Sequence, residues 1–131
     1  ENNVQRLLGD AFWDWGIPTV VSLAEATQTV KIPVIASGGV RSGVDIAKAL
    51  ALGASLTSLS QPVLQAAVKG AKDTESILSL LIEELRNVMF LVGAEKVDYL
   101  AKAPIVVTGK TAKWLKTRGF NVESYARRGA R

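Results

Sequence analysis

The sequence predicts an α/β fold in which short parallel strands are each followed by a helix. Residues 34–36 form a brief apolar run between Pro33 and a pair of glycines, which is typical of a strand covered on both faces in a parallel sheet. A second strand is expected within 55–60, and it leads into a helical stretch at 63–69. Two successive strand-to-helix junctions should lie side by side, at the same edge of one sheet.

The first expected element is a helix over residues 1–8, whose apolar residues share one face and which Gly9 should end. This pattern indicates the end of a structural element that begins upstream. A second helix should start near Pro18, which suits an early helical position, and should end near Lys31. The chain then turns into the central strand.

The stretch between these two helices is unusually aromatic. Trp13 and Trp15 need packing partners, because exposing large aromatic side chains has a cost in free energy. We expect them to cover the bottom or rim of a core. In the alternative interpretation, Asp14 or Trp15 faces a ligand from this loop.

A phosphate-binding loop is expected between the central strand and the helix that follows it. Gly38 and Gly39 lack a Cβ, so consecutive N–H groups can approach an anion while the next helix presents its positive end. Arg41 adds a cation and a bidentate donor at the same place. In the alternative, the two glycines only make a tight turn and the arginine lies over the rim of the sheet.

Two further helices follow from caps and periodicity. The helix after the glycine loop should begin with Ser42 as its cap and should end at Gly53. Residues 73–93 form the clearest helix, capped by Asp73 or Thr74, because their apolar residues recur along one stripe. A helix of this kind usually covers a sheet or forms an oligomer contact.

The C-terminal part should contain a short helix at 97–101, an extended piece at 104–107 and a helix at 110–118. The sequence Thr108-Gly109-Lys110-Thr111 resembles the end of a nucleotide-binding phosphate loop. That motif requires a glycine at position 104, where this chain has proline, so we reject a nucleotide site here. Thr108 is instead expected to cap the helix.

Composition limits the possible functions. The 131 residues are 48% hydrophobic, which is enough to bury the core of one small domain, and the net charge is +4. Much of the basic excess follows residue 109, but no aromatic residues interleave the final arginines, so we expect a solvated surface and no nucleic-acid partner. Without cysteine or histidine, this segment has no disulfide, thiolate nucleophile, imidazole base or ordinary zinc site. No signal peptide or membrane span is evident, and the cytoplasm is the expected location.

Specific motifs resemble a known enzyme group. Residues 37–54 resemble the phosphate-binding segment of FMN-dependent (β/α)8 barrels, which include 2-hydroxy-acid oxidases and inosine monophosphate dehydrogenase. The sequence Phe12-Trp13-Asp14-Trp15-Gly16-Ile17-Pro18-Thr19, together with Gln61-Pro62-Val63-Leu64, is similar to type 2 isopentenyl-diphosphate isomerases of the archaeal sort. Residues 104–119 also resemble the C-terminal segment of that family. The resemblance therefore covers nearly the whole chain.

The resemblance implies the C-terminal portion of an FMN-binding (β/α)8 TIM barrel, in a single partial domain. Residues 1–103 would be about the last two to three β/α units and 104–131 a C-terminal extension. The FMN phosphate would then be bound by residues of two loops, namely Gly38, Gly39, Val40 and Arg41 from the first and Ser60 and Gln61 from the second. Many relatives have Ala-Leu or Ala-Arg where this chain has Ser60-Gln61. We therefore expect main-chain N–H donors from that second loop and leave its side-chain roles open.

The implied reaction interconverts isopentenyl diphosphate and dimethylallyl diphosphate, with reduced FMN as the acid/base cofactor, Mg²⁺, and NADPH as the reductant. No catalytic or metal-binding residue of the family matches this segment; those positions would lie upstream. The isolated 131 residues are therefore expected to be inactive. The expected partners are the diphosphate substrate, the rest of the barrel and further copies in a homo-oligomer.

Two alternatives remain open. One is another FMN-dependent barrel such as a 2-hydroxy-acid oxidase, although the usual Gly-Arg-Pro of those enzymes is replaced here by Ser60-Gln61-Pro62. The other is a non-catalytic phosphate-binding half-barrel that completes itself by association, since two strands cannot close a barrel.

Overall fold

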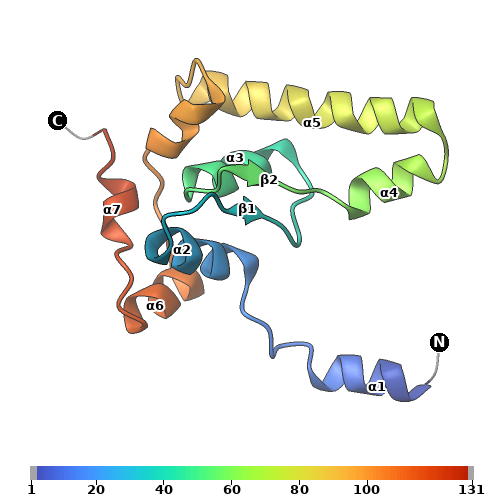
Figure 1. The fold of residues 1–131 in the computed structure, drawn as a ribbon, viewed down its shortest axis with the longest axis horizontal. Coiled ribbons are helices and arrows are strands. Elements are labelled where there is room, and N and C mark those ends of the chain that lie inside the picture. The colour runs from blue at the N-terminus through green and yellow to red at the C-terminus, as the bar shows by residue number, and fades with distance from the viewer. Residues whose placement is uncertain (1–2, 130–131) are drawn as a thin grey trace.

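A computed structural model describes residues 3–129 of the chain (Figure 1). The elements follow in the order α1 (Asn3–Ala11), α2 (Thr19–Thr29), β1 (Ile35–Ala36), α3 (Gly43–Ala51), β2 (Leu56–Thr57), α4 (Gln61–Ala67), α5 (Ala71–Leu91), the 3₁₀ helix η1 (Val97–Lys102), α6 (Gly109–Thr117) and α7 (Glu123–Ala126). Helices therefore dominate the described part of the chain, and they accompany a two-stranded sheet.

The two strands form a parallel pair. Ile35 lies opposite Leu56 and Ala36 opposite Thr57. The pairing continues past the strands, because the N–H of Ser58 donates to the carbonyl oxygen of Ala36 at 2.8 Å. Since α3 is the crossover between β1 and β2, the chain leaves both strands at the same edge of the sheet (Figure 1). The expected neighbouring strand-to-helix junctions are thus confirmed.

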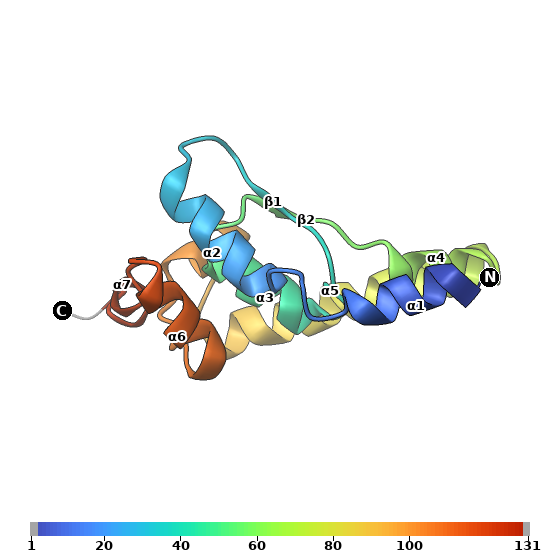
Figure 2. The ribbon, with the colours of Figure 1, turned by 90° about the horizontal axis from the view of Figure 1, so that it is seen from below.

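The sheet is covered on one face within residues 3–129. Ala36 is 3% exposed, whereas the side chains beside it in the ladder, Ile35 and Leu56, are 59% and 61% exposed. In Figure 2 α3 and α5 lie on one side of the two strands. The expectation that 34–36 is covered on both faces is therefore wrong for this chain, because side chains of a strand alternate between faces and helices pack on only one of them.

Helix α3 is the central element of the core. One buried cluster joins it to α2 and the C-terminal part of the chain, and consists of Val21, Leu23, Ala24, Ala36, Ala49, Leu52, Ala54, Leu115, Val122 and Tyr125. A second cluster joins it to η1, with side chains of α5 packed against it, and consists of Val40, Ile46, Ala47, Leu50, Ala94 and Leu100. Because α3 contributes to both clusters, its position depends on all the surrounding helices.

The N-terminal part differs from expectation. Gly9 lies within α1, which ends at Ala11 and so extends beyond the predicted stop. Trp13 and Trp15 are 83% and 82% exposed, so the expectation that they cover the rim of a core is wrong for the residues described. Phe12 and Trp15 pack edge to face, with ring centroids 5.9 Å apart. Figure 1 shows α1 standing away from α4 and α5.

The helix starts are partly as predicted. Ser42 caps α3, because its Oγ accepts a hydrogen bond of 3.1 Å from the N–H of Asp45. Helix α5 instead begins after Gly70, and neither Asp73 nor Thr74 is its cap. Glycine can adopt the φ angle of +140° found at Gly70, so the helix begins there and not at Asp73 or Thr74. The Thr74 hydroxyl donates to the Gly70 carbonyl oxygen at 3.0 Å.

The C-terminal segment, residues 104–129, is fastened to the end of α3. Gln28 Nε2 donates to the Tyr125 hydroxyl at 3.1 Å, and that hydroxyl donates to the Leu52 carbonyl oxygen at 3.5 Å. The Arg128 guanidinium donates to the Ala51 carbonyl oxygen and lies 4.6 Å from the centre of the Tyr125 ring. The expected solvated basic tail is thus wrong at Arg128, because the last carbonyls of α3 attract a cation.

An ion pair joins α6 to α7 and makes the stability of this contact depend on pH. Lys116 Nζ lies 2.6 Å from Glu123 Oε1, and the hydrogen bond from this ammonium holds the pKa of Glu123 below its ordinary value of 4.5. A carboxyl whose pKa is lower in the folded state contributes stability above the unfolded pKa and loses it as the pH falls through the folded pKa.

We therefore expect the pKa of Glu123, followed by its carboxyl carbon shift in NMR, to rise toward 4.5 in Lys116→Met. Replacing Lys113 on the same helix, which forms no ion pair within residues 3–129, should leave it unchanged. An equal pKa in wild type and Lys116→Met would show that the ion pair has no effect.

Candidate functional site

The loop between β1 and α3 contains consecutive unpaired N–H groups. Gly38 and Gly39 adopt φ angles of +93° and +77°, a left-handed conformation that favours glycine. Their N–H groups and that of Val40 donate to no acceptor within residues 3–129. Val40 is 8% exposed and fixes the loop to the core by its side chain. The loop thus offers three consecutive donors on an anchored backbone, which is the arrangement that binds anions.

The space around the two glycines differs. A Cβ on Gly39 would meet nothing within 4 Å, so the backbone there is open to an approaching ligand. A Cβ on Gly38 would come to 3.4 Å from Thr19 Oγ1 at the start of α2. The positive φ angles, more than steric crowding, therefore explain why glycine stands at these positions.

The N-terminus of α3 is partly paired with protein acceptors. The N–H of Gly43 donates to Glu84 Oε2 at 2.5 Å, and the N–H of Arg41 donates to Asp45 Oδ2 at 3.2 Å. A third N–H of this turn, that of Asp45, donates to Ser42 Oγ. The sequence predicted that the positive end of this helix would face the anion, but two carboxylates now occupy it. Three consecutive free donors lie in the loop before the helix, and the N–H of Val44 in the first turn also has no acceptor within residues 3–129.

Arg41 and the second loop are exposed. The Arg41 guanidinium forms no hydrogen bond or ion pair with the described residues, so it is available to a ligand. Ser60 stands at the cap position of α4 without a side-chain capping bond, and Gln61 is the first residue of that helix. Neither main-chain N–H donates to an acceptor within 3–129. Both loops leave adjacent parallel strands at one edge, as the sequence predicted.

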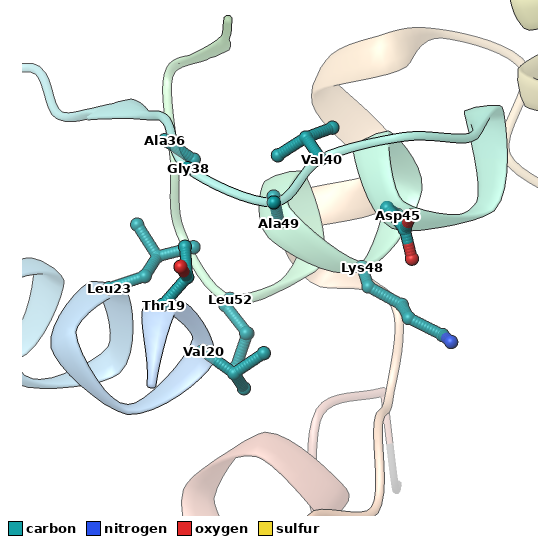
Figure 3. Close-up of a pocket in the computed structure, with 11 residues that line it drawn as sticks. Thr19, Val20, Leu23, Ala36, Gly38, Val40, Asp45, Lys48, Ala49 and Leu52 are labelled. Atoms are coloured by element: carbon teal, nitrogen blue, oxygen red, sulfur yellow. The ribbon is translucent and has the colours of Figure 1, made fainter. Parts of the chain in front are cut away.

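A hollow of about 100 Å³ lies beside the first loop (Figure 3). Gly38, Gly39 and Val40 line it, and Figure 3 shows Asp45 and Lys48 extending from α3 next to it. The other predicted site residues, Arg41, Ser60 and Gln61, do not line this hollow. The structure thus gathers half of the predicted set in the hollow and leaves the other half on the exposed edge.

Lys48 was not predicted to belong to this region. It follows Asp45 by three positions, and that spacing places both side chains on one face of a helix. The spacing could therefore have indicated a cation near the loop. Lys48 lines the hollow from α3, and Figure 3 shows its ammonium extending outward, away from Gly38 and Val40.

The described residues show neither a metal cluster nor a membrane-spanning helix. Within residues 3–129, no three side chains of the His, Cys, Asp or Glu type gather into a group that could hold a metal ion. The resemblance places the Mg²⁺ ligands upstream of this segment. None of the helices over that same range has both the length and the apolar character that crossing a bilayer requires.

Comparison with known proteins identifies the class. Residues 13–107 match the family of FMN-dependent dehydrogenases, and the chain belongs to that family. A crystal structure of mandelate oxidase with (S)-2-phenylpropionate superposes with a TM-score of 0.62 and 39% identity, over 66% of this chain and 27% of that one. A mandelate oxidase mutant with a monooxide FMN adduct gives the same TM-score and identity over 29% of its length. The α/β fold is thus confirmed as part of an FMN-type barrel.

The curated relatives narrow the class further. Isopentenyl-diphosphate delta-isomerase of Methanothermobacter thermautotrophicus is 50% identical over 123 residues, which are 94% of this chain and 35% of that protein. The isomerase of Thermococcus kodakarensis is 49% identical over 97% of the chain and 34% of its own length. The chain therefore spans about a third of the length of the relatives it matches. The resemblance stated from the motifs is confirmed.

Proposed function

We propose that this chain forms the FMN-phosphate end of an isopentenyl-diphosphate delta-isomerase. The observation that carries the proposal is the identity of 50% with such an isomerase across 94% of the chain. The site agrees with it, because three free N–H groups in a left-handed glycine loop suit a phosphate. They are accompanied by the Arg41 guanidinium, which has no partner among the described residues and can form a bidentate pair with phosphate oxygens.

The proposed task of the chain is to bind and orient. The N–H groups of Gly38, Gly39 and Val40 hold the phosphate from one loop, and those of Ser60 and Gln61 approach it from the next. Reduced FMN supplies the acid/base chemistry of an allylic proton shift without net redox change. No side chain of this chain is assigned to the proton transfer itself. Its contribution is to fix the cofactor by its phosphate, so that the ring is presented to the alkene in one orientation.

No described residue is assigned to the metal ion, the substrate or the reductant that the proposed reaction needs. We propose that Mg²⁺, the diphosphate of the substrate and the reductant NADPH are bound by the rest of the barrel. We also propose a homo-oligomer, because α5 exposes apolar side chains such as Leu78, Leu80 and Ile82. The cytoplasm remains the proposed location.

The activity is tested in a chimera in which this chain replaces the matching third of the Methanothermobacter thermautotrophicus isomerase. The purified chimera should contain flavin and isomerise isopentenyl diphosphate under reducing conditions. The isolated 131 residues should not. A 2-hydroxy-acid oxidase is the second candidate, because the structural likeness to mandelate oxidase reaches 39% identity. A chimera that oxidises 2-hydroxy acids and does not isomerise would overturn the proposal.

The loop is tested by Gly39→Val in the same chimera. A β-branched residue at a φ of +77° costs about 1–3 kcal/mol of strain and displaces the N–H groups, so FMN affinity should fall by about tenfold or more. Arg41→Ala should have a smaller effect, because the main-chain donors remain.

The matched control is Gly119→Val. Gly119 has a similar φ of +80° and open space around it, but it follows α6 and lies outside both loops. It should carry the same strain and leave FMN affinity, measured by fluorescence titration, unchanged. Equal losses of affinity in the two variants would remove the loop assignment.

A further inference from the structure

A carboxylate of α5 is bonded to the start of α3, directly after the phosphate loop. Glu84 Oε2 accepts the hydrogen bond of 2.5 Å from the N–H of Gly43, across 41 positions of the sequence. Glu84 is half-buried and lies near the middle of α5. The contact therefore fixes the point at which the loop of residues 38–42 ends.

The two helices touch at this point through their backbones. A Cβ on Gly43 would lie 2.5 Å from the Cβ of Glu84 and 2.5 Å from the main-chain nitrogen of Leu85. It would also lie 2.6 Å from the carbonyl oxygen of Leu81. Only glycine allows so close an approach, and this approach brings the N–H of Gly43 within reach of the carboxylate.

The bond also decides where an anion can bind. The N–H groups at a helix N-terminus attract anions, but here Glu84 and Asp45 have taken two of the donors around that terminus. A phosphate placed there would lose a hydrogen bond and would face two carboxylates. The three consecutive free donors of Gly38, Gly39 and Val40 are the place where a phosphate gains the most hydrogen bonds without displacing a carboxylate.

We propose that Glu84 is a positioning residue for the flavin phosphate. By holding Gly43 it fixes the downstream end of the loop and occupies one donor at the terminus of α3, so that the consecutive donors of the loop hold the phosphate. This inference rests on the proposed function, namely that the loop of 38–41 binds the phosphate of FMN. The hydrogen bond, more than the negative charge, is the part that positions the loop.

The experiment compares FMN with riboflavin, which lacks the phosphate, as ligands of the flavin-free chimera. Glu84→Ala should lower the affinity for FMN about five- to tenfold. The affinity for riboflavin should stay unchanged, because only the phosphate contacts depend on the loop. Glu84→Gln keeps an oxygen acceptor for the N–H of Gly43, so its affinity for FMN should remain within about twofold of the wild-type affinity. Glu83→Ala is the matched control, since the exposed Glu83 side chain pairs with Arg86 on its own helix.

Hydrogen exchange at the Gly43 amide is the second measurement. Exchange should accelerate in Glu84→Ala and stay slow in Glu84→Gln. If the alanine variant does not fold, Glu84→Asp takes its place. This substitution keeps the negative charge but shortens the side chain, so it should lower the affinity for FMN in the same way.

Three results would overturn the inference. The first is an unchanged FMN affinity in Glu84→Ala, and the second is an equal loss of affinity for FMN and riboflavin, which a purely structural role would give. The third is tighter FMN binding in both Glu84→Ala and Glu84→Gln, which would mean that the charge alone matters. If the unsubstituted chimera binds FMN and riboflavin equally, the phosphate function of the loop fails instead, and the inference fails with it.

Discussion

Replacing Gly43 by alanine should destabilise the fold by about 1–3 kcal/mol, the range typical of overpacking. Glycine to alanine within a helix ordinarily stabilises, so the expected sign is reversed here. The added methyl group would lie 2.5 Å from Leu85 N and 2.6 Å from Leu81 O, and backbone atoms cannot rotate away. Helix α3 would have to separate from α5, which would open the core cluster around Leu50 and Leu100.

The control for this prediction is Gly9→Ala in α1. A Cβ at Gly9 meets nothing within 4 Å, so this variant should be neutral or more stable by up to about 1 kcal/mol. Urea unfolding of the two chimeras at equilibrium measures both free energies. Equal stability of Gly43→Ala and Gly9→Ala would contradict the close contact between α3 and α5.

Tyr125→Ala should release the C-terminal extension and cost about 3–5 kcal/mol, as expected for the loss of a large buried aromatic side chain. Tyr125 is 2% exposed and belongs to the core cluster that includes Leu115 and Leu52. Its main-chain oxygen also accepts a hydrogen bond of 3.1 Å from the N–H of Ile105. Without the ring, Arg128 loses the surface on which it lies.

Tyr125→Phe separates packing from hydrogen bonding. It removes only the hydroxyl that bonds to Gln28 and Leu52, so the expected loss is about 0.5–1.5 kcal/mol. Urea unfolding gives the free energies, and limited proteolysis after residue 104 reports release of the extension. Losses of the same size for the alanine and phenylalanine variants would show that packing of this ring does not hold the extension.

Local signals predicted the parts of the fold that depend on neighbouring residues. Ser42 caps α3 as expected, and Gly38 and Gly39 have the left-handed backbone that the phosphate-loop interpretation needs. The parallel order of the two strands also followed from the sequence, because a strand, a loop and a crossover helix leave few other arrangements. These features depend on short-range backbone geometry, which a single sequence encodes directly.

Contacts between distant segments were not predictable in the same way. The bond from Gly43 to Glu84 spans 41 positions, and that from Gln28 to Tyr125 spans 97. Nothing in the sequence near either residue marks its partner. The exposure of Trp13 and Ile35 was missed for a related reason, since burial depends on which segments surround a side chain and not on its hydrophobicity alone.

The central claim is that the N–H groups of the first loop bind the phosphate of FMN. A crystal structure of the chimera with FMN tests it most directly. The account predicts phosphate oxygens about 2.7–3.2 Å from the main-chain nitrogens of Gly38, Gly39 and Val40, with Gly43 still bonded to Glu84. A phosphate bound instead at the N-terminus of α3, with the bond from Gly43 to Glu84 broken, or bound away from both loops, would contradict it.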